Sequence, residues 1–121
     1  MDVLVLSTDL IVTSLVGGAA RRRGMRFESA GSAAALLERL AKSDAGSSQQ
    51  SPLLLIDLST TGLNVGELVK SLREQATPVR VFAFGPHVHE QRLAEARDAG
   101  CDRVLSRGQF QAQIDALVAG E

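Results

Sequence analysis

Short apolar runs alternate with amphipathic segments along the whole chain. The apolar runs predict five strands, at residues 3–6, 25–30, 53–57, 79–84 and 102–106. Apolar positions at helical spacing predict five helices, at residues 11–23, 33–41, 65–76, 87–99 and 110–118. Ile11, Leu15 and Ala19 mark the apolar stripe of the first helix, Asn64 and Glu67 form a capping pair for the third, and Gly100 ends the fourth.

Strands that are apolar throughout and alternate with helices predict an α/β fold. We expect a doubly wound five-stranded parallel sheet, covered on both faces by five helices, in the order 2-1-3-4-5. In such sheets ligands bind outside the carboxyl ends of the strands, where the crossover direction reverses between strands 1 and 3. These ends carry Ser7-Thr8-Asp9, Asp57, Ala83-Phe84-Gly85 and Ser106-Arg107. The topology therefore places Asp57 at the expected ligand-binding edge.

Composition narrows the classes of function. A chain of 121 residues with 45% apolar residues predicts a single domain spanning residues 1–121, with the polar segment 43–51 as a surface loop. Thirteen basic and 14 acidic side chains give a net charge of −1, so neither nucleic acid nor a membrane surface is an expected partner. No apolar run reaches the roughly 18 residues of a membrane span. Met1-Asp2 lacks the bases of a signal peptide, so we expect a cytoplasmic protein.

Other motifs are weak. Cys101 is the only cysteine, and we expect a small buried apolar residue rather than a reactive thiol. His87 and His89 are two positions apart, which on a helix does not direct them at one metal, so we expect surface histidines. Gly17-Gly18 lacks the spacing of a phosphate-binding loop and indicates close helix packing. Arg21-Arg22-Arg23 favours the helix dipole, with contact to phosphate or an acidic partner as the alternative.

The segment around Asp57 resembles the phosphoacceptor stretch of response-regulator receiver domains of two-component signalling. In Leu53-Leu54-Leu55-Ile56-Asp57-Leu58-Ser59-Thr60-Thr61-Gly62, Asp57 stands at the acceptor position and Gly62 at the glycine of the following loop. The run at 3–6 resembles the family's first strand, and Ala99-Gly100-Cys101-Asp102 its approach to the fifth. The resemblance covers nearly the whole chain and implies a flavodoxin-like receiver fold.

The positions that carry the family's chemistry differ. Ser7 and Thr8 occupy the places of two adjacent acids, and the nearest acid, Asp9, is one residue late. Phosphoryl transfer to a carboxylate needs Mg²⁺ held by several oxygens, so we expect Asp57 to bind Mg²⁺ weakly or not at all, and we expect no other cofactor. Ala83 stands where the family has the hydroxyl at the end of strand 4. Ser59, two residues after Asp57, is a further candidate residue of this site.

The positions after strand 5 differ too. Arg107 replaces the family's lysine, Gly108 the proline that follows it, and Val104 the aromatic residue that relays the phosphorylation state. Arginine is a planar donor suited to carboxylates. We therefore hypothesise that Arg107 pairs with Asp57, so that Arg107→Ala would leave a buried carboxylate unpaired. The alternative is that both side chains face water and rarely meet.

These departures predict an atypical receiver, or pseudo-receiver, rather than an enzyme. We expect a signalling module that acts through protein–protein interaction without aspartyl phosphorylation. The alternative is a weakly active phosphoacceptor that takes a phosphoryl group on Asp57 from a histidine kinase, and a small-molecule binder is a third possibility. The resemblance implies a partner or homodimer surface on helix 4, strand 5 and helix 5. This chain would present it with the residues Val88, His89, Arg92, Arg97 and Arg103.

Overall fold

The computed structural model describes residues 2–42, 52–75 and 78–119, and the positions given for Ala76 and for the 43–51 loop lie outside them. The strands are β1 Val3–Leu6, β2 Phe27–Ala30, β3 Leu53–Asp57, β4 Arg80–Gly85 and β5 Arg103–Ser106. The helices are α1 Leu10–Arg22, α2 Ala33–Lys42, α3 Val65–Arg73, α4 Glu90–Ala99, α5 Arg107–Ala112 and α6 Ile114–Val118. The predicted alternation of strands and helices is confirmed.

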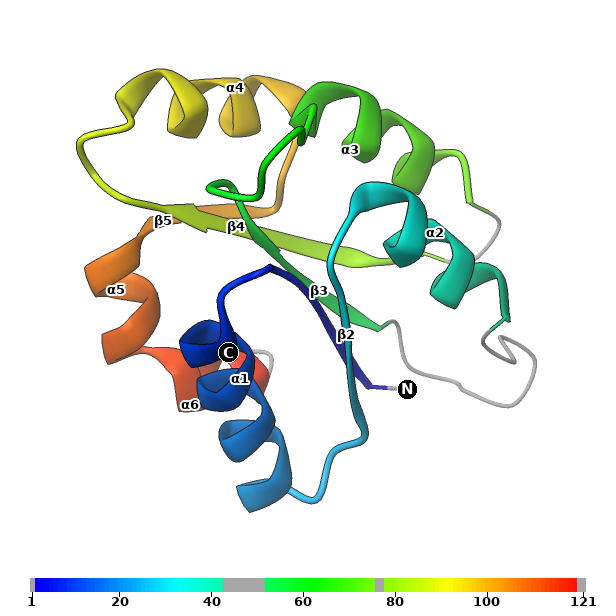
Figure 1. Cartoon of the computed structure of the whole chain (residues 1–121), viewed down its shortest axis with the longest axis vertical. Helices are drawn as coiled ribbons and strands as arrows, with labels where there is room; N and C mark the ends of the chain where they lie inside the picture. Colours follow the sequence, from blue (N-terminus) through cyan, green and yellow to red (C-terminus); the bar gives the residue numbers. More distant parts are fainter. Residues whose placement is uncertain (1, 43–51, 76–77, 120–121) are drawn as a thin grey trace.

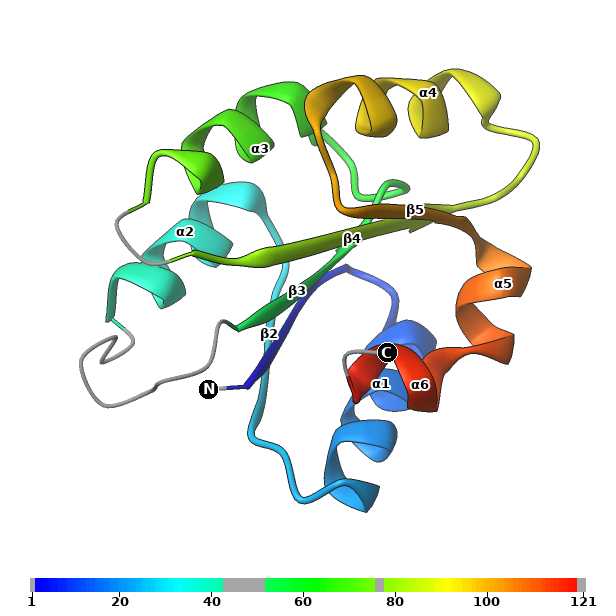
Figure 2. The same cartoon turned by 180° about the vertical axis from the view of Figure 1, so that it is seen from behind.

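The five strands form one parallel sheet in the order β2-β1-β3-β4-β5, which confirms the predicted fold class. Helices α2, α3 and α4 lie over one face, and α1, α5 and α6 over the other (Figures 1 and 2). All the strands run in one direction, so their carboxyl ends meet at one edge of the sheet. We call this the carboxyl edge.

Alternate residues of the central strands fill two cores, one on each face of the sheet. Leu4, Leu6, Leu54 and Ile56 belong to the core beneath α2, α3 and α4. Val3, Val5, Leu53 and Leu55 belong to the core beneath α1, α5 and α6. Both faces of β1 and β3 are therefore shielded from water, as the continuous apolar runs predicted. The first polar side chains after these strands lie at the carboxyl edge.

Helix α1 buries only one residue of the predicted stripe, Ala19, and leaves Ile11 and Leu15 exposed. Val12, Val16, Ala19 and Ala20 are buried, whereas Ile11 is 67% exposed. The first half of α1 is apolar on most sides, so the spacing of its apolar residues does not select the face that packs on the sheet. Gly17 lies on the buried side, where an added Cβ would be 3.3 Å from the Phe27 ring. The expected close packing of this glycine is confirmed.

Several helix boundaries differ from the predictions: α3 ends at Arg73 rather than Ala76, and α5 begins at Arg107 rather than Phe110. Helix α4 begins at Glu90 rather than His87, because residues 86–89 form a turn in which His89 N–H donates to Pro86 O at 2.9 Å. The last helix is divided into α5 and α6 at Gln113, whose φ and ψ of −111° and 11° are not helical. Two predicted ends are confirmed. Asn64 Oδ1 accepts from Glu67 N–H at 3.1 Å, and Gly100 ends α4 with a φ of 98°.

Candidate functional site

Asp57 is the last residue of β3 and lies at the carboxyl edge, opposite Phe84 of β4. Its side chain is buried, with an exposed fraction of 3%. Its Oδ2 accepts a hydrogen bond from Ser7 Oγ at 2.7 Å, and its Oδ1 accepts one from Ser59 N–H at 2.9 Å. Both carboxylate oxygens thus have neutral donors. Among the described residues, no basic side chain forms an ion pair with Asp57.

Ser7 links Asp57 to the start of α1. It follows β1 directly and is buried. Its hydroxyl donates to Asp57 and accepts from the backbone N–H of Asp9 at 3.0 Å. One small hydroxyl therefore occupies the place beside Asp57 where the resemblance implies an acid, and it is satisfied there as donor and acceptor.

The turn after Asp57 contains a hydroxyl that the sequence analysis did not select. Thr60 is buried, and its Oγ1 donates to the backbone oxygen of Asp57 at 2.7 Å. Thr60 N–H donates to the same oxygen at 3.1 Å. A hydroxyl three residues after an aspartate at a strand end is a typical turn signal, which could have identified Thr60.

A second missed residue reaches this turn from α4. Arg92 Nη1 donates to the backbone oxygen of Leu58 at 2.9 Å. The sequence analysis placed Arg92 on a basic partner surface, whereas here the guanidinium holds the residue next to Asp57. No local signal connects positions 58 and 92, because the contact depends on how α4 packs over the sheet.

The hypothesised pair of Arg107 with Asp57 is wrong. Arg107 is the first residue of α5, and its Nη2 donates to Asp9 Oδ2 at 2.5 Å. Asp9 also caps α1, since its Oδ1 accepts from Ile11 N–H at 2.9 Å. Asp57 already has two donors within the sheet edge, while Asp9 stands at the surface with one oxygen free for Arg107. The alternative, in which both side chains face water, also fails for Asp57.

Three of the remaining predicted positions, Ala83, Val104 and Thr8, form no hydrogen bond with the carboxylate, whereas Ser59 does. Ala83 is fully buried and pairs with Ile56 of β3 and Val104 of β5. Val104 is half-buried and packs against the core beneath α2, α3 and α4. Thr8 is exposed, and Ser59 contributes its backbone N–H. The structure thus brings Ser7, Asp57 and Ser59 together and keeps Asp9 with Arg107.

The pairing predicts a change in acid titration. The hydrogen bond from Arg107, followed by that from Ile11 N–H, holds the pKa of Asp9 below its usual value of 3.8. A lowered pKa in the folded state stabilises the fold above about pH 4, and this contribution is lost as the pH falls through that lowered pKa. Arg107→Ala should raise the pKa of Asp9, as measured by carboxyl NMR titration. The difference in the free energy of unfolding between the wild type and Arg107→Ala should also become smaller in acid.

Arg97→Ala is the control, because Arg97 is exposed on α4 away from Asp9. It should leave the Asp9 titration unchanged. A response of Asp57, rather than Asp9, to Arg107→Ala would restore the original pairing.

The donors present do not fit Mg²⁺. This ion requires near-octahedral oxygen ligands and usually carboxylates. At the carboxyl edge the single buried carboxylate, Asp57, has both oxygens in hydrogen bonds, and Asp9 is held by Arg107. Within residues 2–42, 52–75 and 78–119, no three His, Cys, Asp or Glu side chains gather as a metal site.

Cys101, His87 and His89 are the other candidates for chemistry. Cys101 is partly buried against the core, and burial raises the pKa of its thiol to about 11. A protonated thiol is a poor nucleophile, in keeping with the expectation of an unreactive cysteine. His87 and His89 are exposed, as expected. None of the helices in the described ranges is long and apolar enough to cross a membrane.

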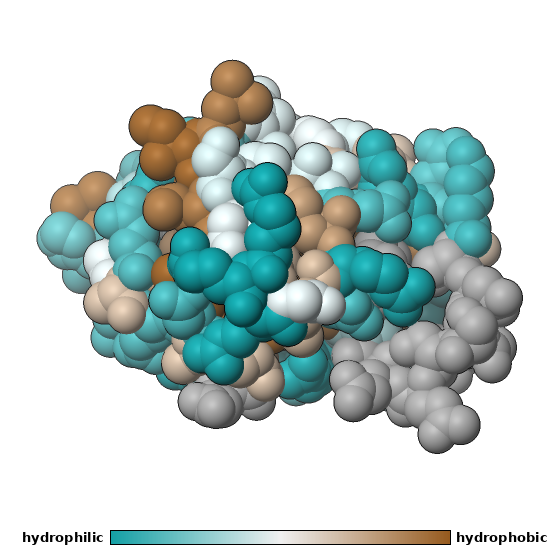
Figure 3. Space-filling view, turned by 90° about the horizontal axis from the view of Figure 1, so that it is seen from below, coloured by the Kyte–Doolittle hydropathy of each residue, from teal (hydrophilic) through white to brown (hydrophobic). Residues whose placement is uncertain are grey.

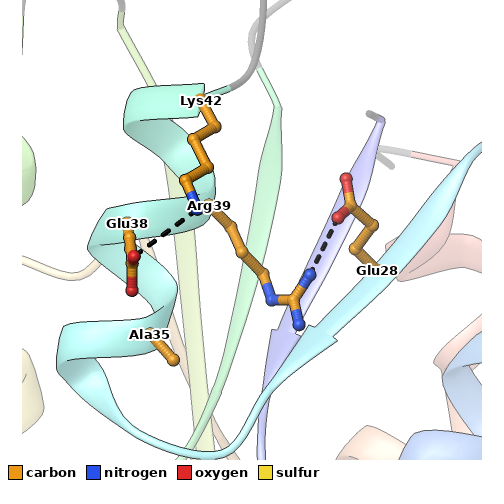
Figure 4. Close-up of a pocket in the computed structure, with 5 residues that line it drawn as sticks. All are labelled: Glu28, Ala35, Glu38, Arg39 and Lys42. Atoms are coloured by element: carbon orange, nitrogen blue, oxygen red, sulfur yellow. Dashed lines mark hydrogen bonds and ion pairs between the residues drawn. The ribbon is translucent and has the colours of Figure 1, made fainter.

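A hollow between β2 and α2 is lined by Glu28, Ala35, Glu38, Arg39 and Lys42 (Figure 4). Its four charged side chains pair with one another. Arg39 binds Glu28 at 3.1 Å, and Lys42 lies 3.5 Å from Glu38. The charges of this hollow are therefore balanced internally, and it lies apart from the carboxyl edge.

Comparisons with known proteins identify the fold. No protein-family model matches the chain, and no curated protein matches it. Among solved structures, the receiver domain of NtrX from Brucella abortus has a TM-score of 0.74 at 20% identity, over 98% of this chain and 95% of that one. The chemotaxis response regulator CheY4 of Vibrio cholerae has a TM-score of 0.74 at 15% identity, over 98% and 96%.

A third similar structure is the beryllofluoride-activated dimer of the NtrC4 receiver domain. Its TM-score is 0.68 at 15% identity, and the match spans 98% of this chain and 97% of that one. These identities are low, while the coverage is nearly complete in each case. The chain therefore has the receiver fold.

Proposed function

We propose that this protein is a receiver-like signalling module of the cytoplasm that acts through protein–protein interaction, independently of phosphorylation at Asp57. The observation that carries the proposal is the state of the Asp57 carboxylate. Both of its oxygens are hydrogen-bonded, to Ser7 Oγ and Ser59 N–H, and Asp9, a second acid at the carboxyl edge, is paired with Arg107. The module is not an enzyme.

Phosphoryl transfer to Asp57 would bring two anions together. It needs a cation that bridges them and a carboxylate oxygen free to attack. Ser7 supplies a hydroxyl rather than a ligand carboxylate, and its hydrogen bond occupies Asp57 Oδ2. Ala83 has no donor for a phosphoryl oxygen. Each of these features argues against an active phosphoacceptor.

One observation favours the second candidate, a weakly active phosphoacceptor. The Asp9 carboxylate lies two residues from Ser7 and is bound at the surface, where side-chain exposure of 34% leaves it open to solvent. If a metal ion displaced Arg107 from Asp9, the Asp9 carboxylate would become available as a second ligand near Asp57. In that case a histidine kinase would be the phosphoryl donor.

On the proposed partner surface of α4, β5 and α5, two of the basic side chains contact neutral groups within the chain and keep their charge. Arg92 binds Leu58 O, and Arg103 lies 5.6 Å from the centre of the Phe82 ring and donates to Gln113. Val88, His89, Arg92 and Arg97 are exposed. A dimer through this surface would have to accommodate these exposed basic side chains.

The test is an amide NMR spectrum with and without millimolar Mg²⁺ and beryllofluoride, a mimic of phosphorylated aspartate. We expect the spectrum of the wild-type protein to remain unchanged around Asp57, Ala83 and Arg107. Asp57→Asn serves as the matched control, because it keeps the shape of the side chain and removes its charge. Saturable shifts in the wild type that Asp57→Asn abolishes would overturn the proposal and establish a working phosphoacceptor.

A further inference from the structure

The peptide group that joins Leu58 to Ser59 is hydrogen-bonded on both sides, and we call it the linking peptide. Its C=O, from Leu58, accepts from Arg92 Nη1 at 2.9 Å. Its N–H, from Ser59, donates to Asp57 Oδ1, also at 2.9 Å. The linking peptide is trans and planar, so its C=O and N–H point in opposite directions. One rigid unit therefore lies between the guanidinium of Arg92 on α4 and the buried carboxylate of Asp57 on β3.

The order of charges across the linking peptide is favourable. Its carbonyl oxygen, the negative end of the peptide dipole, faces the Arg92 guanidinium. Its N–H, the positive end, faces the Asp57 carboxylate. Hydrogen bonds to ionised groups are stronger than those between neutral groups, and hydrogen bonds in a chain polarise one another. Arg92 thus stabilises the buried carboxylate through the peptide.

Leu58 is fixed on the side of β4. Its N–H donates to Phe84 O at 2.9 Å, and its side chain is buried. An added Cβ at Gly85 would lie 3.3 Å from Leu58 Cβ, so the glycine allows a close approach of the two strands. Because Leu58 is held in this way, a rotation of the linking peptide would break its bonds to Asp57 and Arg92 together.

The start of α4 depends on few contacts. Within the described chain, its N-cap residue His89 forms no side-chain capping bond. The buried residues of α4 are Leu93 and Ala96, and Arg92 directly precedes the first of them. The bond from Arg92 to Leu58 O therefore ties the first half of α4 to the carboxyl edge.

We propose that Asp57 is a positioning residue for α4, with the linking peptide as the connection and Arg92 as the group that is held. The ionised carboxylate orients the peptide, and the peptide oxygen then holds the guanidinium. Ala83 and Val104 have no polar side-chain group, so these positions of β4 and β5 offer no side-chain route instead. The inference deepens the proposed function, on which its biological role rests, because α4 belongs to the proposed partner surface.

The test measures backbone amide exchange by NMR in the full chain. Arg92→Ala should speed the exchange of amides in the first half of α4 by about tenfold, because a hydrogen bond from a charged donor is lost. The Ser59 amide proton should also move upfield, since the carbonyl of its peptide loses a neighbouring cation. Asp57→Asn keeps the shape of the side chain and removes its charge. It should speed exchange of the same α4 amides by about fivefold.

The double variant decides whether the two residues act through one connection. If they do, adding Asp57→Asn to Arg92→Ala should cause no further increase in the exchange of α4 amides. Arg92→Lys keeps a charged donor. It should therefore retain part of the protection of α4 and should still respond to Asp57→Asn.

Two further variants are controls. Arg97→Ala makes the same change of residue type at an exposed position of α4, so it separates loss of the hydrogen bond from the change in helix propensity. Ser7→Ala removes the donor to the other carboxylate oxygen, Asp57 Oδ2, and leaves the linking peptide intact. Both should leave the exchange of α4 amides unchanged.

The second half of α1 is the internal reference, because α1 lies over the opposite face of the sheet from α4 (Figures 1 and 2). Figure 3 views the molecule from the side of α1 and α6 and shows large apolar residues gathered at one corner. The exposed apolar residues of α1 are Leu10, Ile11 and Leu15. None of the variants changes them, so self-association through these residues would be the same in every protein compared.

Three results would overturn the inference. They are α4 exchange in Arg92→Ala equal to that in Arg97→Ala, an effect of Ser7→Ala on α4 as large as that of Asp57→Asn, and single effects that multiply in the double variant. The beryllofluoride titration tests the proposed function separately. Saturable shifts at Asp57 would reject phosphorylation independence, whereas failure of the double-variant comparison would reject the linking peptide alone.

Discussion

Ser7→Asp should destabilise the protein by on the order of 3–5 kcal/mol in metal-free buffer, and Mg²⁺ should restore much of that loss. Ser7 Oγ lies 2.7 Å from Asp57 Oδ2, and both residues are buried. A carboxylate at position 7 would place two like charges side by side with little water to screen them. A hard cation would then find two carboxylates where the wild type offers one. Urea denaturation with chelator or with millimolar Mg²⁺ measures both effects.

Ser7→Asn is the matched control for this variant. Its side chain has nearly the size of aspartate without the charge, so it should be less destabilising and should not respond to Mg²⁺. If Ser7→Asp is as stable as Ser7→Asn in chelator, or gains nothing from Mg²⁺, the assignment of Ser7 as the substituted ligand position is wrong. A gain specific to Ser7→Asp would identify the hydroxyl as one reason why Asp57 does not hold the metal.

Phe110→Ala should destabilise the protein by about 3–5 kcal/mol, the usual range for a buried phenylalanine. Phe110 is fully buried, and its ring stacks on Phe84 with 3.8 Å between the ring centres and 7° between their planes. It is also the buried residue of α5, a helix of six residues. Since Arg107 begins this helix, we expect the variant to weaken the Asp9–Arg107 pair as well. Thermal unfolding and the Asp9 titration measure the two consequences.

Gln111→Ala is the control on the same helix, because Gln111 is exposed. It should change the free energy of unfolding by less than about 0.5 kcal/mol. Phe110→Leu should fall between the two variants, since it retains part of the buried volume. A loss below about 1 kcal/mol for Phe110→Ala would mean that α5 is anchored by contacts other than the Phe84 stack.

The sequence by itself determined the architecture and the place of Asp57. A run such as Leu53-Leu54-Leu55-Ile56 is typical of a strand covered on both faces, and the alternation with helices then favours a parallel sheet. From that topology alone, the carboxylate after the run belongs at the carboxyl edge, and the structure places it there. These predictions depend on local sequence and on the order of the elements, so small changes in loop geometry do not alter them.

Which face of α1 is buried was decided only by packing. Five of its first seven residues are apolar, namely Leu10, Ile11, Val12, Leu15 and Val16. Several rotations of the helix would bury a plausible stripe, and in the folded protein Val12 and Val16 are the buried ones. Ile11 is left on the surface as a consequence, which the spacing of apolar residues did not indicate.

The partners of the charged groups were likewise decided by tertiary structure. The sequence places Asp57, Asp9 and Arg107 at one edge, but a hydrogen bond requires donor and acceptor to come within about 3 Å. Three loops that follow different strands set these distances. As a result, Ser7 donates a hydrogen bond to Asp57, and Arg107 donates one to Asp9. Residue types along the chain thus determine which groups meet at the carboxyl edge, and only the packed loops determine which of them bind one another.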